Sequence, residues 1–180
     1  MVVIAQDIQG AEVARPWVEQ AGGTYRALLD QHNVVGKAYG LKYVPVAILL
    51  DEAGRLVRPV ASCNIDDEEF RRQLQDWAVS GQVPQAWMEA EDPGAAAILN
   101  EDEAEADARF QLALVLLQRG KREEALAQLR QAVRLDPQNW LIRKQMWAIE
   151  APQAFYEGAV DYGWQKAQME REKEELLGGS

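Results

Sequence analysis

Few side chains in this sequence are of a type that does chemistry, and the thiol of Cys63 is the first of them. Cys63 is the only cysteine, so neither an intramolecular disulfide nor a two-cysteine redox cycle can form. It precedes a predicted helix that Asp66 would cap, and a helix N-terminus favours the thiolate. The position therefore allows an inert thiol, which we favour, and a reactive thiol that consumes peroxide.

The other candidate groups fit structural roles. His32, the only histidine, lies between two amide side chains in a predicted loop, where it reads as a solvated turn residue. The acidic run from Glu101 to Glu105 suits the first turn of a helix, because carboxylates there offset the helix dipole. Metal-ligand spacing, a glycine-rich phosphate loop and a paired nucleophile and base are all missing. We therefore predict no catalytic residue, no metal and no cofactor.

Composition and net charge exclude some classes of binding partner. Of the 180 residues, 48% are hydrophobic, and 29 acidic against 19 basic side chains give a net charge of −10. Such a surface repels nucleic acid and anionic membranes, and no run approaches the roughly 18 apolar residues that span a bilayer. Since the opening residues have no export-signal pattern, we expect a cytoplasmic protein. If the natural protein has a longer N-terminus, that segment could carry an export signal, and the cellular compartment would then stay undecided.

Residues 1–80 alternate short apolar runs with helical patterns, as in an α/β fold. Val2–Gln6 and Tyr25–Leu29 read as buried parallel strands. Helical patterns follow each of them, over Ala11–Ala21 and Val34–Tyr39. Because Pro16 would interrupt the first of these helices, we expect a late start for it.

A hairpin and a helix complete the first part. Val46–Leu50 is a strongly apolar strand, and the turn Asp51–Gly54 leads into Arg55–Val60 with hairpin spacing. The helix that follows is expected to be capped by Asp66, with Glu69 reaching back to complete a capping box.

Two stretches carry a family resemblance: VVIAQDIQGAEVARPWVEQAGGTYRALLD and AYGLKYVPVAILLDEAGRLV. Together they resemble the later part of the TlpA/ResA and AhpC/TSA-type thioredoxin-like proteins. The most specific feature is Val44-Pro45 before the apolar strand. The resemblance implies a cis-proline loop at Val44 and Pro45, with Pro45 beside the active-site sulfurs.

The departure from that family concerns its redox centre. Residues 1–80 lack the first βα unit and the CxxC motif that it carries. In the family's topology the missing strand lies between the strands at Val2–Gln6 and Val46–Leu50, which leaves their backbone groups unpaired. Three explanations stay open: another chain supplies the pairing, the sheet rearranges, or Met1 is an internal start of a longer protein.

The second part, residues 101–180, reads as all helix. After a connector at residues 81–100, rich in proline and glycine, ADARFQLALVLLQRGKREEALAQLRQAVRLDPQN looks like one tetratricopeptide repeat. Two apolar-striped helices flank a turn at Gly120, and Asp136-Pro137 ends the second helix. One repeat cannot bury both of its faces, so it must pack against something else.

Apolar residues stand where peptide-binding repeats present polar ones. They form a packing surface whose complement is either a folded partner or the chain's own helices. The candidate interface residues are Phe110, Leu114, Leu117, Trp140 and Trp147, with Arg143 and Lys144 as a basic rim.

These observations predict an incomplete thioredoxin-like α/β segment followed by helices of tetratricopeptide type. The function we favour is a redox-inactive module whose helices mediate association with a protein partner or as a homodimer. The alternative is the C-terminal part of a thiol-disulfide oxidoreductase or peroxiredoxin-like enzyme whose redox motif is missing.

Overall fold

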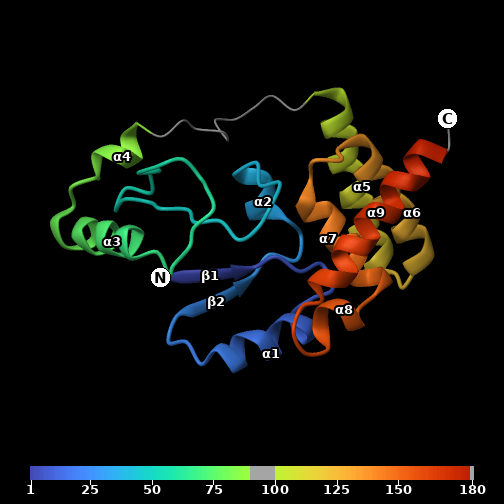
Figure 1. Cartoon of the computed structure of the whole chain (residues 1–180), viewed down its shortest axis with the longest axis horizontal. Helices are drawn as coiled ribbons and strands as arrows, with labels where there is room; N and C mark the ends of the chain where they lie inside the picture. Colours follow the sequence, from blue (N-terminus) through green and yellow to red (C-terminus); the bar gives the residue numbers. More distant parts are fainter. Residues whose placement is uncertain (90–99, 179–180) are drawn as a thin grey trace.

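The computed structural model describes residues 1–89 and 100–178. The chain begins with a small parallel sheet and continues into a stack of helices (Figure 1). Strand β1 (Val2–Ala5) pairs in parallel with β2 (Arg26–Leu29), in a register that places Val2 opposite Arg26. Helix α1 (Ala11–Ala21) connects the two strands, which confirms the predicted βαβ order.

The predicted late start of α1 is wrong, because the helix runs through Pro16. A proline removes one backbone hydrogen bond, here the bond to the carbonyl of Glu12. Glu12 is exposed, so water can reach that carbonyl. Gly22 then ends the helix in the left-handed conformation, with φ of 59°.

Helix α2 (Val34–Ala38) begins on a carboxylate that follows β2. Asp30 is buried and accepts hydrogen bonds from the backbone N–H groups of Val34 and Val35, at 2.7 and 2.8 Å. The side chain of Gln6 donates a further bond to Asp30 at 2.7 Å. The end of β1, the end of β2 and the start of α2 are thereby joined.

The predicted segments Val46–Leu50 and Arg55–Val60 do face each other across the Asp51–Gly54 turn, but they do not form the two continuous strands that the sequence predicted. Two isolated antiparallel bridges, Ala47 with Ala61 and Leu50 with Leu56, remain around a tight turn. The two segments lie side by side through a few backbone hydrogen bonds, such as the one from the N–H of Val57 to the carbonyl of Leu49, but neither joins the sheet of β1 and β2. Among the described residues the first part is therefore an α/β unit with a sheet of two strands, and this sheet alone does not show a thioredoxin fold.

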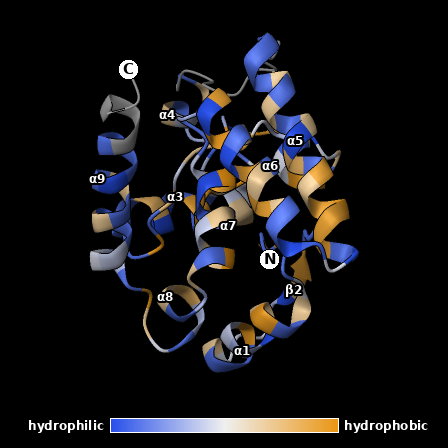
Figure 2. Cartoon of the chain, turned by 90° about the vertical axis from the view of Figure 1, so that its right-hand side faces the viewer, coloured by the Kyte–Doolittle hydropathy of each residue, from blue (hydrophilic) through white to orange (hydrophobic). Residues whose placement is uncertain are grey.

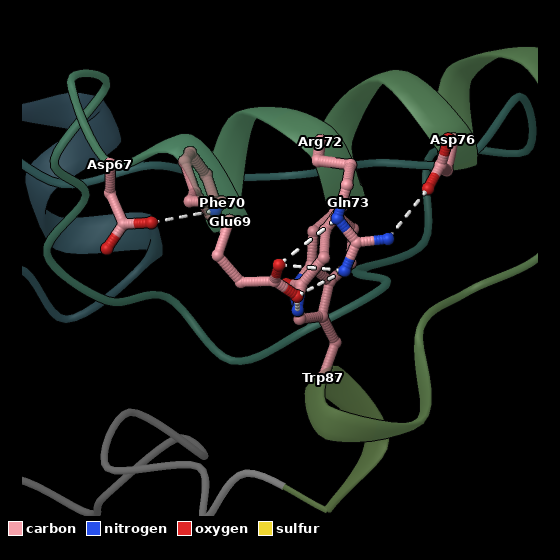
Figure 3. Close-up of polar contacts among 7 residues, drawn as sticks. All are labelled: Asp67, Glu69, Phe70, Arg72, Gln73, Asp76 and Trp87. Carbon is pink, nitrogen blue, oxygen red and sulfur yellow. Dashed lines mark hydrogen bonds and ion pairs between the residues drawn. The ribbon is translucent and has the colours of Figure 1, made fainter.

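Helices α3 (Glu68–Ser80) and α4 (Gln85–Met88) form a small satellite cluster. Asp67, not Asp66, caps α3 by accepting from the N–H of Phe70 at 2.9 Å, and Glu69 binds Arg72 instead of reaching back to the cap (Figure 3). The indole N–H of Trp87 donates to Gln73 at 2.8 Å. Buried Trp87 thus ties α4 to α3.

The second part consists of α5 (Glu101–Gln118), α6 (Arg122–Leu135), α7 (Trp140–Glu150), α8 (Gln153–Tyr156) and α9 (Tyr162–Gly178). Asn100 and Glu103 form a capping box at the start of α5. Residues 90–99, half of the predicted connector, lie outside the described residues. No described helix has both the length and the apolar character that a membrane crossing requires.

The hydrophobic core lies almost entirely among these helices. Its largest fully buried side chains are Trp147, Phe110 and Leu129. Residues 1–80 contribute one buried hydrophobic side chain, that of Ile8. Ile8 packs into the helical cluster, so the main hydrophobic core of the described residues is centred on the second part.

Candidate protein-interaction site

Helices α5 and α6 form an antiparallel hairpin in which small residues allow close packing. Ala113, Ala125 and Ala132 are completely buried at the contact between them. Gly120 makes the turn with φ of 71°, a conformation that favours glycine. Helix α7 packs against α6, so the hairpin has a helical neighbour on that side.

The apolar surface predicted as an interface is filled by the chain itself. Phe110, Leu114 and Trp147 are buried, with 0%, 4% and 0% of their surfaces exposed. Ile8 and Leu41 from the first part pack into the same cluster. Of the two complements expected for this surface, the described residues therefore provide the intramolecular one.

Two lysines, one within α2 and one in the segment after it, form ion pairs with the hairpin. The Nζ atom of Lys37 lies 2.6 Å from Asp107, and Lys42 binds Glu103 and, at 3.2 Å, Asp136. Burial alone would lower the pKa of Lys42, but the hydrogen bonds and charges of the two carboxylates outweigh it and raise the pKa. The same contact lowers the pKa of Glu103.

The backbone strengthens this attachment. The N–H of Leu141, in the first turn of α7, donates to the carbonyl of Lys42 at 2.9 Å. A helix start leaves its first N–H groups without intrahelical partners, and this one is satisfied by the first part of the chain. The segment that follows α2 is thus bound to the start of α7 by a backbone hydrogen bond.

A second attachment uses Gln145 on α7. Its side-chain oxygen accepts from the N–H of Ile8 at 3.1 Å, while its amide nitrogen donates to the carbonyl of Gln6 at 2.7 Å. Gln9 adds a bond to the carbonyl of Ala148 at 3.2 Å. The loop that leaves β1 is therefore hydrogen-bonded along α7.

The predicted basic rim divides between two environments. The Nε atom of Arg143 lies 3.1 Å from Glu172 of α9, and its guanidinium lies over the ring of Trp140 at 5.2 Å. Arg143 is therefore used within the helical part. Lys144, by contrast, lines a cavity beside β1.

The outer face of α5 has no neighbour among the described elements. Ala108, Leu112 and Val115 lie along one side of the helix and are exposed, the last two by 46% and 42%. Hydrophobic residues continue along most of the second half of α5 (Figure 2). We call these three residues the α5 stripe. A repeat stacked before this hairpin would cover such a face.

A comparison with protein families identifies the hairpin. A family model of the tetratricopeptide repeat matches residues 106–139. This match supports the helical part of the predicted fold, and repeats of this kind point to interactions between proteins. Searches of curated proteins and of solved structures found no match.

The residues suggested by the thioredoxin resemblance are not brought into one centre. Cys63 is half-buried in the loop before α3 and forms no hydrogen bond with the described residues. The Val44-Pro45 peptide bond is cis, and Val44 lines the same cavity as Lys144. Among the described residues, no group of three or more His, Cys, Asp or Glu side chains is arranged to hold a metal ion.

Sequence reasoning missed the residues that join the two parts. Lys37, Lys42 and Gln145 bind partners that lie 61 to 139 positions away along the chain. A lysine or glutamine at such a position has the same local signature as an ordinary surface residue. The sequence did indicate an apolar surface on the repeat, and such a surface has to be covered by other residues.

Proposed function

We propose that this chain is a redox-inactive association module, in which a thioredoxin-like α/β segment is held on a helical scaffold of tetratricopeptide type. The two segments would meet across a connector at residues 81–100. With Cys63 as the only cysteine, the chain cannot run a two-cysteine redox cycle of its own. Its partner is a protein, and we infer a second copy of the chain.

The observation that carries this proposal is the exposed α5 stripe. A repeat hairpin buries its core by stacking on neighbours at both sides. Here α7 supplies one neighbour, and Leu112 and Val115 on the opposite side stay in contact with solvent. A symmetric pair that placed one stripe against the other would supply the second neighbour without leaving an open end.

Charge sets the conditions under which such a pair forms. Each chain carries a net charge of −10, so two copies repel one another at low ionic strength. Salt screens this repulsion and strengthens apolar burial. Self-association should therefore increase with ionic strength.

The test is the molar mass in solution, measured by light scattering and sedimentation equilibrium over a range of protein and salt concentrations. We expect a reversible dimer for the unmodified chain and a monomer for the double variant Leu112→Glu with Val115→Glu. Val79→Glu is the matched control, because Val79 is 90% exposed on α3 and lies outside the stripe. It should leave the dimer intact.

A monomer at every concentration and salt level would contradict self-association. A dimer that survives both stripe substitutions would show that a different surface holds the two copies. Circular dichroism of each variant separates a lost interface from a lost fold.

A further inference from the structure

A cavity of about 420 Å³ lies where β1, α1, α7 and α8 meet. Figure 1 shows β1 ending beside α7 and α8, with α1 below the sheet. Most of the lining is apolar or aromatic: Val3, Trp17, Val18, Val44, Phe155 and Val160. Cavities of this size and character hold small organic ligands in other proteins. We call it the junction cavity.

Most polar side chains that line the junction cavity already have hydrogen-bond partners within the protein. Both ends of the Gln145 amide bind the backbone of the β1 loop, and the amide nitrogen of Gln6 donates to Asp30. The hydroxyl of Tyr156 donates to Asp7 at 2.8 Å and accepts from Gln9 at 2.9 Å. These groups form a fixed wall with little capacity left for a ligand.

Two charged side chains on the lining, Asp7 and Lys144, still have open hydrogen-bonding positions. Neither Asp7 nor Lys144 takes part in an ion pair within the described part of the chain, and the two do not pair with each other. The Asp7 carboxylate accepts from the N–H of Gln9 at 2.9 Å and from Tyr156. A carboxylate offers about four acceptor positions, so roughly two stay open. The ammonium group of Lys144 has three donors and forms no hydrogen bond or ion pair with the described residues.

The state of Asp7 supports a ligand role. Burial raises the pKa of its carboxyl group, although the hydrogen bonds from Tyr156 and Gln9 oppose this change. A carboxylate that is partly withdrawn from water and has no ion-pair partner is stabilised when a cationic group binds beside it. The aromatic rings around it are also favourable neighbours for an ammonium group.

We propose that the junction cavity binds a free α-amino acid with a large apolar side chain. The ammonium group of the ligand would pair with Asp7, its carboxylate with Lys144, and its side chain would pack against Trp17 and Phe155. A zwitterion is the simplest ligand that matches one acid, one base and an apolar lining within a single cavity. This site does not depend on the α5 stripe or on self-association.

The experiment titrates the full chain with L-phenylalanine by calorimetry and by NMR of the tryptophan indole N–H groups. Two further ligands each lack one charge: 2-phenylethylamine has no carboxylate and 3-phenylpropionate has no ammonium group. We expect each of them to bind about tenfold or more weakly than phenylalanine, since each loses one charge-assisted hydrogen bond. The indole signal of Trp17 should shift with phenylalanine.

Variants of Asp7 and Lys144 test which charged group of the ligand each side chain binds. Asp7→Asn should weaken phenylalanine about tenfold and leave 3-phenylpropionate unchanged. Lys144→Gln should weaken phenylalanine and leave 2-phenylethylamine unchanged. The matched controls are Asp102→Asn and Lys166→Gln, which alter exposed charges on α5 and α9 away from the cavity. They should bind phenylalanine as the unmodified chain does.

Three results would overturn the proposal. One is a lack of phenylalanine binding at millimolar concentration. Another is equal binding of all three ligands, which would reduce the site to an apolar surface. The third is loss of binding in the control variants to the same extent as in Asp7→Asn and Lys144→Gln. The ligand series on the unmodified chain keeps its meaning even where a variant fails to fold.

Discussion

The helical part and the α/β part bury their apolar side chains to very different extents. In the helical part Phe110, Leu129 and Trp147 are fully enclosed. In the α/β part Val2, Ile4 and Leu28 sit on a sheet yet remain 37% to 52% exposed. Both parts contain apolar runs in the sequence, so the presence of such runs does not by itself decide which part contains the hydrophobic core.

Geometry explains the difference. A stack of helices buries an apolar stripe on each member against its neighbours, as α5, α6 and α7 do. A sheet of two strands has two faces and two open edges, and it is marginal unless other elements cover them. The α/β part therefore depends for its order on contacts with the helical part, made by Ile8, Lys42 and Gln145.

The largest effect is expected from cutting into the helical core. Trp147→Ala should lower the free energy of unfolding by about 3 to 5 kcal/mol, because it removes a completely buried ring and leaves a cavity. Leu28→Ala in the α/β part should cost below about 1 kcal/mol, since half of that side chain is already in water. Urea denaturation followed by circular dichroism measures both.

Equal losses for these two variants would contradict the comparison between the two parts. So would a smaller loss for Trp147→Ala than for Leu28→Ala.

A smaller loss of stability is expected from a substitution that weakens the attachment of the α/β part to α7. Gln145→Leu leaves the buried N–H of Ile8 without a partner, at a cost of about 1 to 3 kcal/mol, while the carbonyl of Gln6 is only partly buried and can bind water. Hydrogen exchange should become faster in β1 and the loop after it, while α5 and α6 keep their protection. Gln131→Leu, at an exposed site on α6, is the matched control.

Uniformly faster exchange along the whole chain would show that the two parts unfold as one unit. In that case the α/β part would not depend on this attachment separately.

The sequence predicted the helical part well because its information is local. Turn residues, alanine positions and the end at Asp136-Pro137 fix the hairpin over residues 106–139, which a family model also matches. The segment Val46–Leu50 is strongly apolar, yet it makes only isolated bridges with the segment after its turn and does not join β1 and β2 in the sheet. Strand formation depends on partners distant in sequence, and a single strand's pattern cannot supply them.

The candidate site shows the same limit. The apolar surface at Phe110 and Leu114 was predicted, and so was the need for a complement. Which complement fills it depends on Ile8 and Leu41, about 70 to 100 positions away. The ionic contacts of Lys37 and Lys42 likewise join residues 70 and 61 positions apart.

The unfolding free energy should depend on pH through Asp7, which lies where the two parts meet. Burial raises the pKa of Asp7 above its value of 3.8, so the folded chain binds more protons than the unfolded chain between 3.8 and the raised value. This group's contribution to the unfolding free energy therefore rises as the pH falls through that window. Asp7→Asn should remove the rise.

The measurement is the difference in unfolding free energy between Asp7→Asn and the unmodified chain from pH 7 down to pH 3. Other carboxylates, such as Glu103 beside Lys42, have lowered pKa values and act in the opposite direction in both proteins. Taking the difference cancels their contribution. A difference that does not change with pH would contradict the effect of burial on Asp7.

The smallest effect is expected on α3, where the ion pairs have regular helical spacing but are exposed to solvent. Arg72 lies between Glu69, at 2.7 Å, and Asp76, at 3.5 Å, and all three side chains are more than half exposed (Figure 3). Solvent screens such pairs, and holding long side chains in place costs entropy. Arg72→Ala should leave the midpoint of urea denaturation unchanged within error.

Phe70→Ala, on the same helix, is the comparison for Arg72→Ala. The ring of Phe70 lies 6.2 Å from that of Trp87, and the guanidinium of Arg58 lies over it at 5.2 Å. Its removal should lower the midpoint and change the fluorescence of Trp87. If Arg72→Ala destabilised the chain as much as Phe70→Ala, ionic contacts would hold the α/β part together where apolar burial does not. The contrast between the two parts would then lie in the kind of interaction that each uses.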